Sequence, residues 1–505
     1  MSSTVSRIIR PERTTAGTAP APVTHVTNGE ENLYPDYLGN FSKGLPHNEF
    51  GEVDRSAYRQ FVRRLSTEDP GQIEGIELDP SCERPLVNPQ AGLSIDAIGP
   101  RSTDMTIPPA PRMDSAELSA ELCELYWMAL CRDVPFARLT QSDVAQAAAD
   151  DLTRLSDYRA VRQNGRVTPG LLFRGDSPGD HVGPYLSQFL WRDIQFGTYR
   201  FEQRQDTVRP NQDYMTTFDT YLKVQRGWNR TLAPSERDQE NRRFLYSPRA
   251  LAHWLHFDGG PTPAKAFFHA GLILDSLGAP VDAGNPYADS TSQQGFSTFG
   301  TPHLLALVTE VANRALRAVW YQKWFVHRRM RPEVFGARVH QRLSGGRAYE
   351  FIDREVLESD AVDRVFSKWG SYLLPQAFPE GSPMHPSYGA GHGTAAAAAA
   401  TVLKAWFDET AVLDNPVQAN EDGTALVPYE GQDAGRLTVG GELNKLAANV
   451  GIGRNIAGVH WRTDWTESAK LGESLAIQLL REQKAWFKEP HWFTVTRFDG
   501  TTVRF

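Results

Sequence analysis

His385-Pro-Ser-Tyr-Gly-Ala-Gly-His-Gly-Thr394 runs directly into six alanines, Ala395–Ala400. Alanine is the strongest helix former, so the pattern predicts that a helix begins here. The glycines allow close approach of the backbone to a ligand. The amides of Gly391 and His392 are expected to point out of the helix N-terminus, where the helix dipole favours an anion. The alternative interpretation is a glycine turn ahead of an alanine-rich core helix.

Helical periodicity continues on both sides of this segment, and the chain ends differently. Apolar residues recur at helical spacing with carboxylates on the opposite faces. From Trp492 to Phe505, two short runs rich in Thr, Val and Phe flank Asp499-Gly500, which is typical of a β-hairpin. The sequence therefore predicts a mainly α protein of helical bundles, with a few minor strands and a C-terminal hairpin. The predicted helices are 115–131, 142–156, 248–257, 262–277, 302–328, 395–408, 440–457 and 466–485.

Proline divides the chain into unequal parts. Thirteen of the 33 prolines lie at or before Pro111, and proline removes an amide donor and disfavours helix. We expect a mobile N-terminal tail over 1–30 and an irregular, proline-rich arm over 31–112. A helical catalytic domain over 113–485 and the hairpin over 486–505 complete the predicted organisation.

Composition excludes several classes of protein. The formal net charge of −8 gives no support to nucleic-acid binding. No apolar run approaches the ~20 residues that a membrane helix needs, so no membrane association is expected. The N-terminus lacks the apolar core of a signal peptide, which predicts a cytoplasmic protein. The three cysteines cannot form a disulfide framework and are expected to be free thiols.

Two further clusters carry charge at predicted helix ends. Lys323 lies near the end of one long helix, and Arg331 follows immediately before Pro332. Taken alone, this is also what the macrodipole favours at any helix C-terminus. The other cluster is Arg454-x5-His460-x3-Asp464, in which the aspartate lies within reach of an imidazole nitrogen if the backbone stays helical. Its alternative is a surface arginine with a structural histidine.

Together the three clusters describe one composite anion site, and their order resembles the superfamily of vanadium-dependent haloperoxidases and type-2 phosphatidic acid phosphatases. The closer resemblance is to the algal type of vanadium bromoperoxidase, and it extends over about residues 80–485. It implies the helical-bundle fold of that family. The segments that carry it outside the clusters are Asn88-Pro-Gln-Ala-Gly, Thr106-Ile-Pro-Pro-Ala-Pro, Glu124-Leu-Tyr-Trp-Met-Ala-Leu, Leu274-Asp-Ser-Leu-Gly-Ala-Pro, Gly284-Asn-Pro-Tyr, Phe299-Gly-Thr-Pro-His and Val308-Thr-Glu-Val-Ala.

The resemblance implies a vanadate cofactor and a set of residues that hold it. His460 would be the axial ligand of vanadium. Lys323, Arg331 and Arg454 would neutralise the equatorial oxygens, with help from the amide of Gly391.

The resemblance also implies roles for residues around the cofactor. His392 would exchange a proton with bound hydrogen peroxide, and His385 stands where the algal type carries a second pocket histidine. Asp464 would hold His460 from behind, and Asp258 would pair with Arg454.

The chain departs from the family pattern at two places. Ala390 replaces the serine of the usual Ser-Gly-His, so one hydroxyl donor to the cofactor is missing. Algal relatives also bind a divalent cation after an Asn-Pro-Tyr segment. Here a divalent cation near Tyr287 would find Asp289 but then Thr291 and Gln294, which form a poor ligand set for calcium.

The implied activity is oxidation of bromide and iodide by hydrogen peroxide to hypohalous acid, which then halogenates an organic acceptor. Chloride is expected to react poorly. The protein is expected to form a homo-oligomer, a dimer or larger. Two alternatives remain from the residues alone: an acid phosphatase of the same superfamily, with His460 as nucleophile, and a non-catalytic anion-binding assembly protein.

Overall fold

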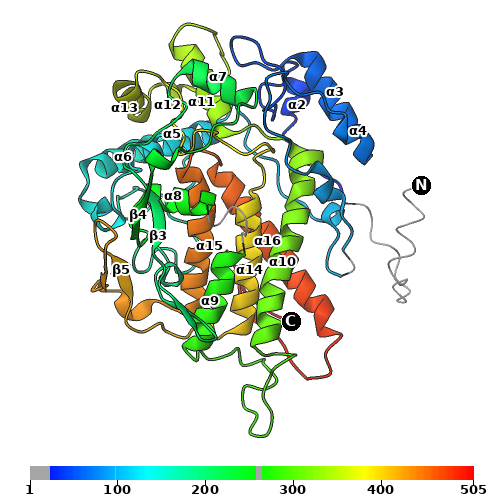
Figure 1. Ribbon diagram of the computed structural model, residues 1–505, viewed down its shortest axis with the longest axis vertical. Coiled ribbons are helices and arrows are strands. Elements are labelled where there is room, and N and C mark those ends of the chain that lie inside the picture. The colour runs from blue at the N-terminus through cyan, green and yellow to red at the C-terminus, as the bar shows by residue number, and fades with distance from the viewer. Residues whose placement is uncertain (1–22, 97, 258–263) are drawn as a thin grey trace.

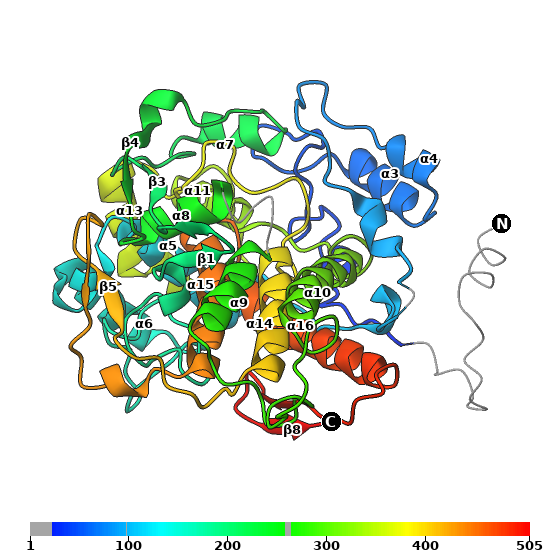
Figure 2. The ribbon, with the colours of Figure 1, turned by 60° about the horizontal axis from the view of Figure 1, so that its bottom comes forward.

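The structure is a computed structural model that describes residues 23–96, 98–257 and 264–505. Its centre is a bundle in which α14 (Gly391–Trp406) packs against α10 (Thr301–Tyr321), α15 (Val439–Ile456) and α16 (Arg462–Lys484). The four helices lie side by side in both ribbon views (Figures 1 and 2). The mainly α fold predicted from the sequence is confirmed. The remaining α-helices are α2 (Glu30–Leu33), α3 (Arg55–Leu65), α4 (Pro70–Glu74), α5 (Ala116–Leu130), α6 (Asp143–Arg154), α7 (Phe218–Gln225), α8 (Pro248–Phe257), α9 (Lys265–Ser276), α11 (Pro332–Leu343), α12 (Arg354–Leu357) and α13 (Asp360–Trp369).

The alanine run lets neighbouring helices approach α14 closely. Every residue of α14 except His392 is buried. A Cβ atom on Gly472 of α16 would lie 2.2 Å from the carbonyl oxygen of Thr394, so only glycine fits at this crossing. Small side chains on α14 and a glycine on α16 thus bring the N-terminus of α14 into the middle of the bundle.

The predicted helix 302–328 does not continue as one α-helix. The structure divides it into α10 and a π-helical turn, η6 (Gln322–His327), after which Arg328 takes a left-handed conformation. A π-turn shifts the phase of the side chains relative to an α-helix, and such turns are frequent at functional sites. Periodicity in the sequence continues smoothly through this segment and does not reveal the change.

Strands contribute four two-stranded antiparallel sheets in the described residues, and the predicted C-terminal hairpin is among them. Val495 pairs with Val503, and Gly500 occupies the turn with φ +83°. The strands are β1 (Ile194–Phe196), β2 (Tyr199–Phe201), β3 (Gln205–Val208), β4 (Arg237–Arg243), β5 (Val417–Ala419), β6 (Leu426–Pro428), β7 (Thr494–Thr496) and β8 (Thr502–Arg504).

The segment 31–112 contains more structure than its proline content predicts. The carboxylate of Asp54 caps α3 by accepting hydrogen bonds from the amides of Ser56 and Ala57. One face of α3 then buries Tyr58, Phe61 and Leu65 in a small core that includes Phe41 and Trp324. Because Trp324 belongs to η6, this core anchors the segment where α10 ends.

The same segment also reaches a loop that leads to the second half of the bundle. Lys43 donates hydrogen bonds to the carbonyl oxygens of Ser382 (2.6 Å) and Glu380 (3.1 Å), and lies 3.4 Å from the carboxylate of Glu333. Arg84 donates to the carbonyl of Glu380 at 2.9 Å. Burial lowers the pKa of Lys43 to about 7. The N-terminal segment therefore holds the loop over 380–382 in place from outside the bundle.

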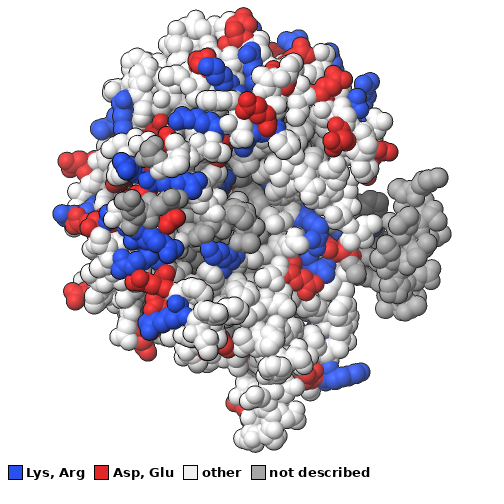
Figure 3. All heavy atoms as spheres, in the orientation of Figure 1, with Lys and Arg blue, Asp and Glu red and all other residues white. Residues whose placement is uncertain are grey.

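The face of the molecule drawn in Figure 3 carries basic and acidic side chains interspersed with one another, in keeping with a net charge of −8 on 505 residues. Among the described residues, no helix combines the length and the apolar character needed to cross a membrane.

Candidate active site

The charged clusters of the sequence meet at one end of the central bundle. Lys323 comes from the π-turn η6, Arg331 from the N-cap of α11 and Arg454 from the last turn of α15. His460 lies in the short connection between α15 and α16, and His392 is the second residue of α14. Residues far apart in the chain are thus assembled by helix ends, where unpaired backbone groups and dipoles also converge.

Arg331 links two of the histidines. Its Nη1 lies 3.0 Å from Nε2 of His460 and donates to the carbonyl of Val459 at 2.7 Å. Its Nη2 lies 3.0 Å from Nδ1 of His385, and its Nε donates to the His385 carbonyl at 2.9 Å. Guanidinium groups can only donate. Nε2 of His460 is therefore the unprotonated nitrogen of that ring and faces the cationic cluster with its lone pair.

The other nitrogen of His460 binds a carboxylate. Nδ1 of His460 lies 2.6 Å from Oδ2 of Asp464, which also accepts the backbone amide of Trp461 at 3.1 Å. Asp464 is the third residue of α16, and the four-residue spacing allows it to reach back over the helix start. This pairing fixes the tautomer of His460 and increases the basicity of Nε2.

Lys323 is completely buried and is held by two carbonyl groups. Its Nζ donates to the backbone oxygens of Pro386 and Ser387, each at 2.8 Å. The ring of Trp320 lies beneath it at 5.6 Å and also contacts the ring of His385, with 4.8 Å between centroids. Burial lowers the pKa of Lys323 well below its usual value, and the Arg331 charge adds to this effect.

The cluster holds more positive charge than its surroundings balance. Burial lowers the pKa of Arg331 to about 10 and that of Arg454 to about 9, and the Arg331 charge contributes to the second shift. Nε of Arg454 and Nε2 of His392 are buried with no hydrogen-bond partner in the structure. Burial lowers the pKa of His392 and His460 well below the usual value, assisted by the neighbouring cations. This set of groups fits an oxyanion with several oxygens, because the cations would gain a counter-charge and the two unpartnered nitrogens would gain a hydrogen-bond partner.

The N-terminus of α14 completes this donor set. Ala390 is its N-cap and supplies no side-chain hydrogen bond to the first turn. Its own amide donates to the hydroxyl of Ser468 at 2.7 Å. A Cβ atom on Gly391 would lie 2.7 Å from the Trp320 ring, so glycine is required where the helix start meets this wall of the site.

A tetrahedral vanadate matches these residues. The unprotonated Nε2 of His460 is a nitrogen donor of the kind that would hold vanadium, and the charge of the buried cations is complementary to that of the oxygens. No thiolate is near, because Cys123 and Cys131 are buried elsewhere, in the core around α5, and Cys82 lies in the N-terminal segment.

Two expectations from the sequence, the partner of Arg454 and the divalent cation, are not met by the described residues. Asp258, the expected partner of Arg454, lies outside the described residues. Asp289 is exposed, and the described residues contain no group of three His, Cys, Asp or Glu side chains able to hold a metal ion. Tyr287 instead donates to Glu489 at 3.1 Å. The structure therefore does not support the divalent cation near Tyr287 and Asp289.

The structure adds residues that sequence reasoning missed. Glu380 is the carboxylate whose charge favours ionised Arg454, and it pairs with Nε2 of His256 at 2.7 Å. Arg329 contacts Asp464 from the side opposite His460, at 2.9 Å. Neither belongs to a recognisable motif. Arg329 lies in the same basic run as Arg328 and Arg331. The sequence therefore does not reveal that its side chain contacts Asp464 and not the cationic cluster.

Comparison with known proteins places the chain in a family. Residues 303–489 match the family model described as the VCPO second helical-bundle domain. The chain is 35% identical to the vanadium-dependent bromoperoxidase of Corallina pilulifera, covering 95% of each chain, and 36% identical to that of Ascophyllum nodosum, covering 99% of this chain and 91% of the relative. A solved structure described as the homohexameric second vanadate-dependent bromoperoxidase (AnII) from Ascophyllum nodosum is similar with a TM-score of 0.89 at 30% identity, covering 96% of this chain and 87% of that one. The resemblance read from the sequence is confirmed: this chain belongs to the vanadium-dependent bromoperoxidases.

Proposed function

We propose that this bromoperoxidase holds vanadate at the cationic cluster around His460 and there uses hydrogen peroxide to oxidise bromide and iodide to hypohalous acid. The observation that carries the assignment is the state of His460. One nitrogen is fixed by Asp464 at 2.6 Å, and the other presents its lone pair to Arg331. A buried imidazole with a fixed tautomer, surrounded by cations, is suited to bind an oxyanion of a Lewis-acidic metal.

The protein's part is to hold charge and exclude water. Lys323, Arg331 and Arg454 would neutralise the oxygens of the anion, and the Gly391 amide would donate to one of them. When bound, vanadate supplies a Lewis acid that activates peroxide for two-electron oxidation of halide. Because the three cations are buried, their charges act in a medium of low dielectric constant and are stronger than in water.

Proton transfer is assigned to His392. Burial and the Arg454 charge lower its pKa, so its ring is neutral and Nε2 is buried without a partner. A neutral imidazole in this position is able to accept a proton from hydrogen peroxide. His385 lies between Trp320 and Arg331, and the same Trp320 ring lies beneath Lys323. The hypohalous acid then halogenates an organic acceptor.

One experiment tests the proposal against its alternatives. Purified metal-free protein is loaded with orthovanadate, and peroxide-dependent bromination is measured beside hydrolysis of a phosphate ester. We expect bromination only after loading, and none in His460→Ala. Phosphate-ester hydrolysis without bromination would support the phosphatase, and vanadate binding without either activity would support an anion-binding protein.

A further inference from the structure

Behind the His460–Asp464 pair lies a second buried arginine that faces away from the cationic cluster. Nη1 of Arg329 donates to Oδ1 of Asp464 at 2.9 Å and to Oγ1 of Thr463 at 2.8 Å. Its side chain is only 3% exposed. The ring of Trp461 lies 5.0 Å from the guanidinium carbon and that of Tyr388 lies 5.6 Å from it. Aromatic faces and a carboxylate therefore restrict Arg329 to one orientation.

A carboxylate from a distant helix holds the other arm of the guanidinium. Nη2 of Arg329 donates to Oε2 of Glu121, on α5, at 3.0 Å. Oε1 of Glu121 accepts the backbone amide of Thr463 at 2.5 Å. Glu121 thus fixes both the arginine and the first turn of α16, which carries Asp464.

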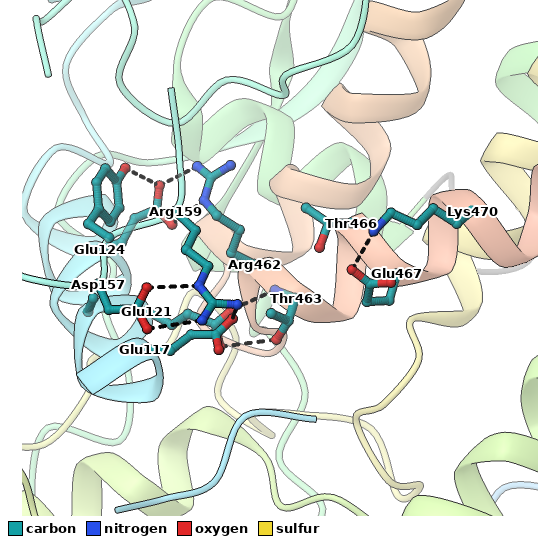
Figure 4. A pocket seen from close by; sticks show the side chains of 12 residues that line it. Glu117, Glu121, Glu124, Asp157, Arg159, Arg462, Thr463, Thr466, Glu467 and Lys470 are labelled. Atoms are coloured by element: carbon teal, nitrogen blue, oxygen red, sulfur yellow. Dashed lines mark hydrogen bonds and ion pairs between the residues drawn. The ribbon is translucent and has the colours of Figure 1, made fainter. Parts of the chain in front are cut away.

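Glu121 also forms part of the wall of a cavity of about 290 Å³ that opens between α5 and α16. Figure 4 shows Glu121 and Thr463 joined among the residues that line this cavity, with Glu117 and Arg159 beside them. Burial raises the pKa of Glu121 to about 7, while the Arg329 charge opposes the shift. An unbroken polar chain therefore runs from this cavity through Glu121, Arg329 and Asp464 to His460.

The charges of this chain determine what it does. His460 Nδ1 and Arg329 bind the two different oxygens of the Asp464 carboxylate, so Arg329 fixes the orientation in which Asp464 meets His460. Arg329 adds a fourth positive charge behind Lys323, Arg331 and Arg454, and two carboxylates, those of Asp464 and Glu121, pair with it.

Arg329 also connects to the lysine side of the site through its backbone. Its carbonyl accepts the amide of Ser387 at 3.1 Å, and the carbonyl of Ser387 accepts from Lys323. One residue thus contacts the supports of both His460 and Lys323.

We propose that Arg329, held by Glu121, is a positioning residue that keeps Asp464 against His460 and so sets the strength of the bond between Nε2 and vanadium. The proposal rests on the assignment of His460 as the vanadium ligand. It concerns that bond alone, and not the retention of an anion by the cations. Partners behind a metal-bound histidine typically change metal affinity by roughly 10- to 100-fold.

Orthovanadate and inorganic phosphate separate these two effects, because phosphate uses the cations and amides but forms no bond to His460. We suggest equilibrium dialysis of each anion against the metal-free full-length protein and its Arg329→Lys and Glu121→Gln variants. Lysine keeps the charge of Arg329 but lacks the planar guanidinium that holds Asp464 and Glu121 in one geometry and packs on Trp461. Both variants are expected to lower the vanadate affinity by roughly 10- to 100-fold, with phosphate affinity unchanged or, in Glu121→Gln, increased.

The expected loss of vanadate affinity in Glu121→Gln is opposite in sign to a general charge effect. Removing a negative charge near a cationic site strengthens binding of any anion. Glu117→Gln is the matched control, because Glu117 lies one turn earlier on α5, lines the same cavity and pairs with exposed Arg159. It is expected to leave the ratio of the two affinities at the parent value.

Parallel loss of both affinities in the two variants would mean a structural role and overturn the proposal, as would an unchanged ratio. If Arg329→Lys does not fold, the isosteric Glu121→Gln decides. His460→Ala checks the underlying assignment: retained preference for vanadate in that variant would refute the site itself, which is distinguishable from failure of the Arg329 role alone.

Discussion

Ala390 stands where the resemblance implies a serine, and it is buried at the N-cap of α14. We predict that Ala390→Ser binds vanadate more tightly. The new hydroxyl would add one hydrogen bond to a charged group, worth roughly 1.5–3 kcal/mol, or about tenfold or more in affinity. Titration with orthovanadate measures the change, with His460→Ala as the variant that should not bind. Equal affinity of Ala390→Ser and the parent would show that another donor already serves the site.

A second single residue, His385, bears on which halides are oxidised. It packs on Trp320 at 4.8 Å and lies 3.0 Å from Arg331, at the position where the resemblance implies a second pocket histidine. With a histidine here and no serine at Ala390, we expect turnover of iodide and bromide and little of chloride. Initial rates at equal halide concentration test this, and chloride turnover equal to that of bromide would contradict it.

A third residue, His253, makes α8 sensitive to acid. It is fully buried between Phe257 and Phe378, neither ring nitrogen has a partner, and burial lowers its pKa well below the usual value. The folded state keeps it neutral while the unfolded chain binds a proton below about pH 6.5, so its contribution to stability is lost as pH falls.

The melting temperature of His253→Phe minus that of the parent should therefore be larger in acidic buffer than in neutral buffer. Thermal melts of both proteins at the two pH values measure the difference. Leu255→Val, on the same helix and without a titratable group, should show the same cost at both. A constant difference for His253→Phe would contradict the assignment.

At the scale of elements, the crossing of α14 and α16 carries the site. Gly472→Ala would place a methyl group 2.2 Å from the Thr394 carbonyl. Forcing the helices apart should destabilise the protein by about 1–3 kcal/mol and weaken vanadate binding, because α14 and α16 carry Gly391 and Asp464. Gly435→Ala is the control, since no atom lies within 4 Å of the place that its new methyl group would occupy. Equal melting temperatures of the two variants would show that the crossing tolerates the methyl group.

At the scale of the whole molecule, we expect a homo-oligomer. An arm with no core of its own would need a second chain to cover it, but α3 gives the segment 31–112 a small core. The stronger support is the similar AnII structure, which is described as homohexameric. Light scattering should give a multiple of the 56.4 kDa chain mass. A single-chain mass at working concentration would contradict it.

Features that depend on local sequence patterns could be predicted, and features that depend on long-range contacts could not. Periodicity and turn residues located the main helices and the hairpin, and the order of Lys323, Arg331, His392, Arg454 and His460 indicated one anion site. The π-turn of η6, the helix α3 and the Arg329–Glu121 contact were missed. The two residues of that contact lie 208 positions apart, and no local pattern encodes which buried charges meet.

The clamp of Lys43 and Arg84 on the loop over 380–382 has a consequence for the newly made chain. Contacts across 339 and 296 residues cannot form until most of the polypeptide has left the ribosome. Arg454, His460 and Asp464 emerge later still. A nascent chain that ends before Arg454 therefore lacks the complete cationic pocket. The proposed oxidation of halide can begin only after synthesis has passed these residues.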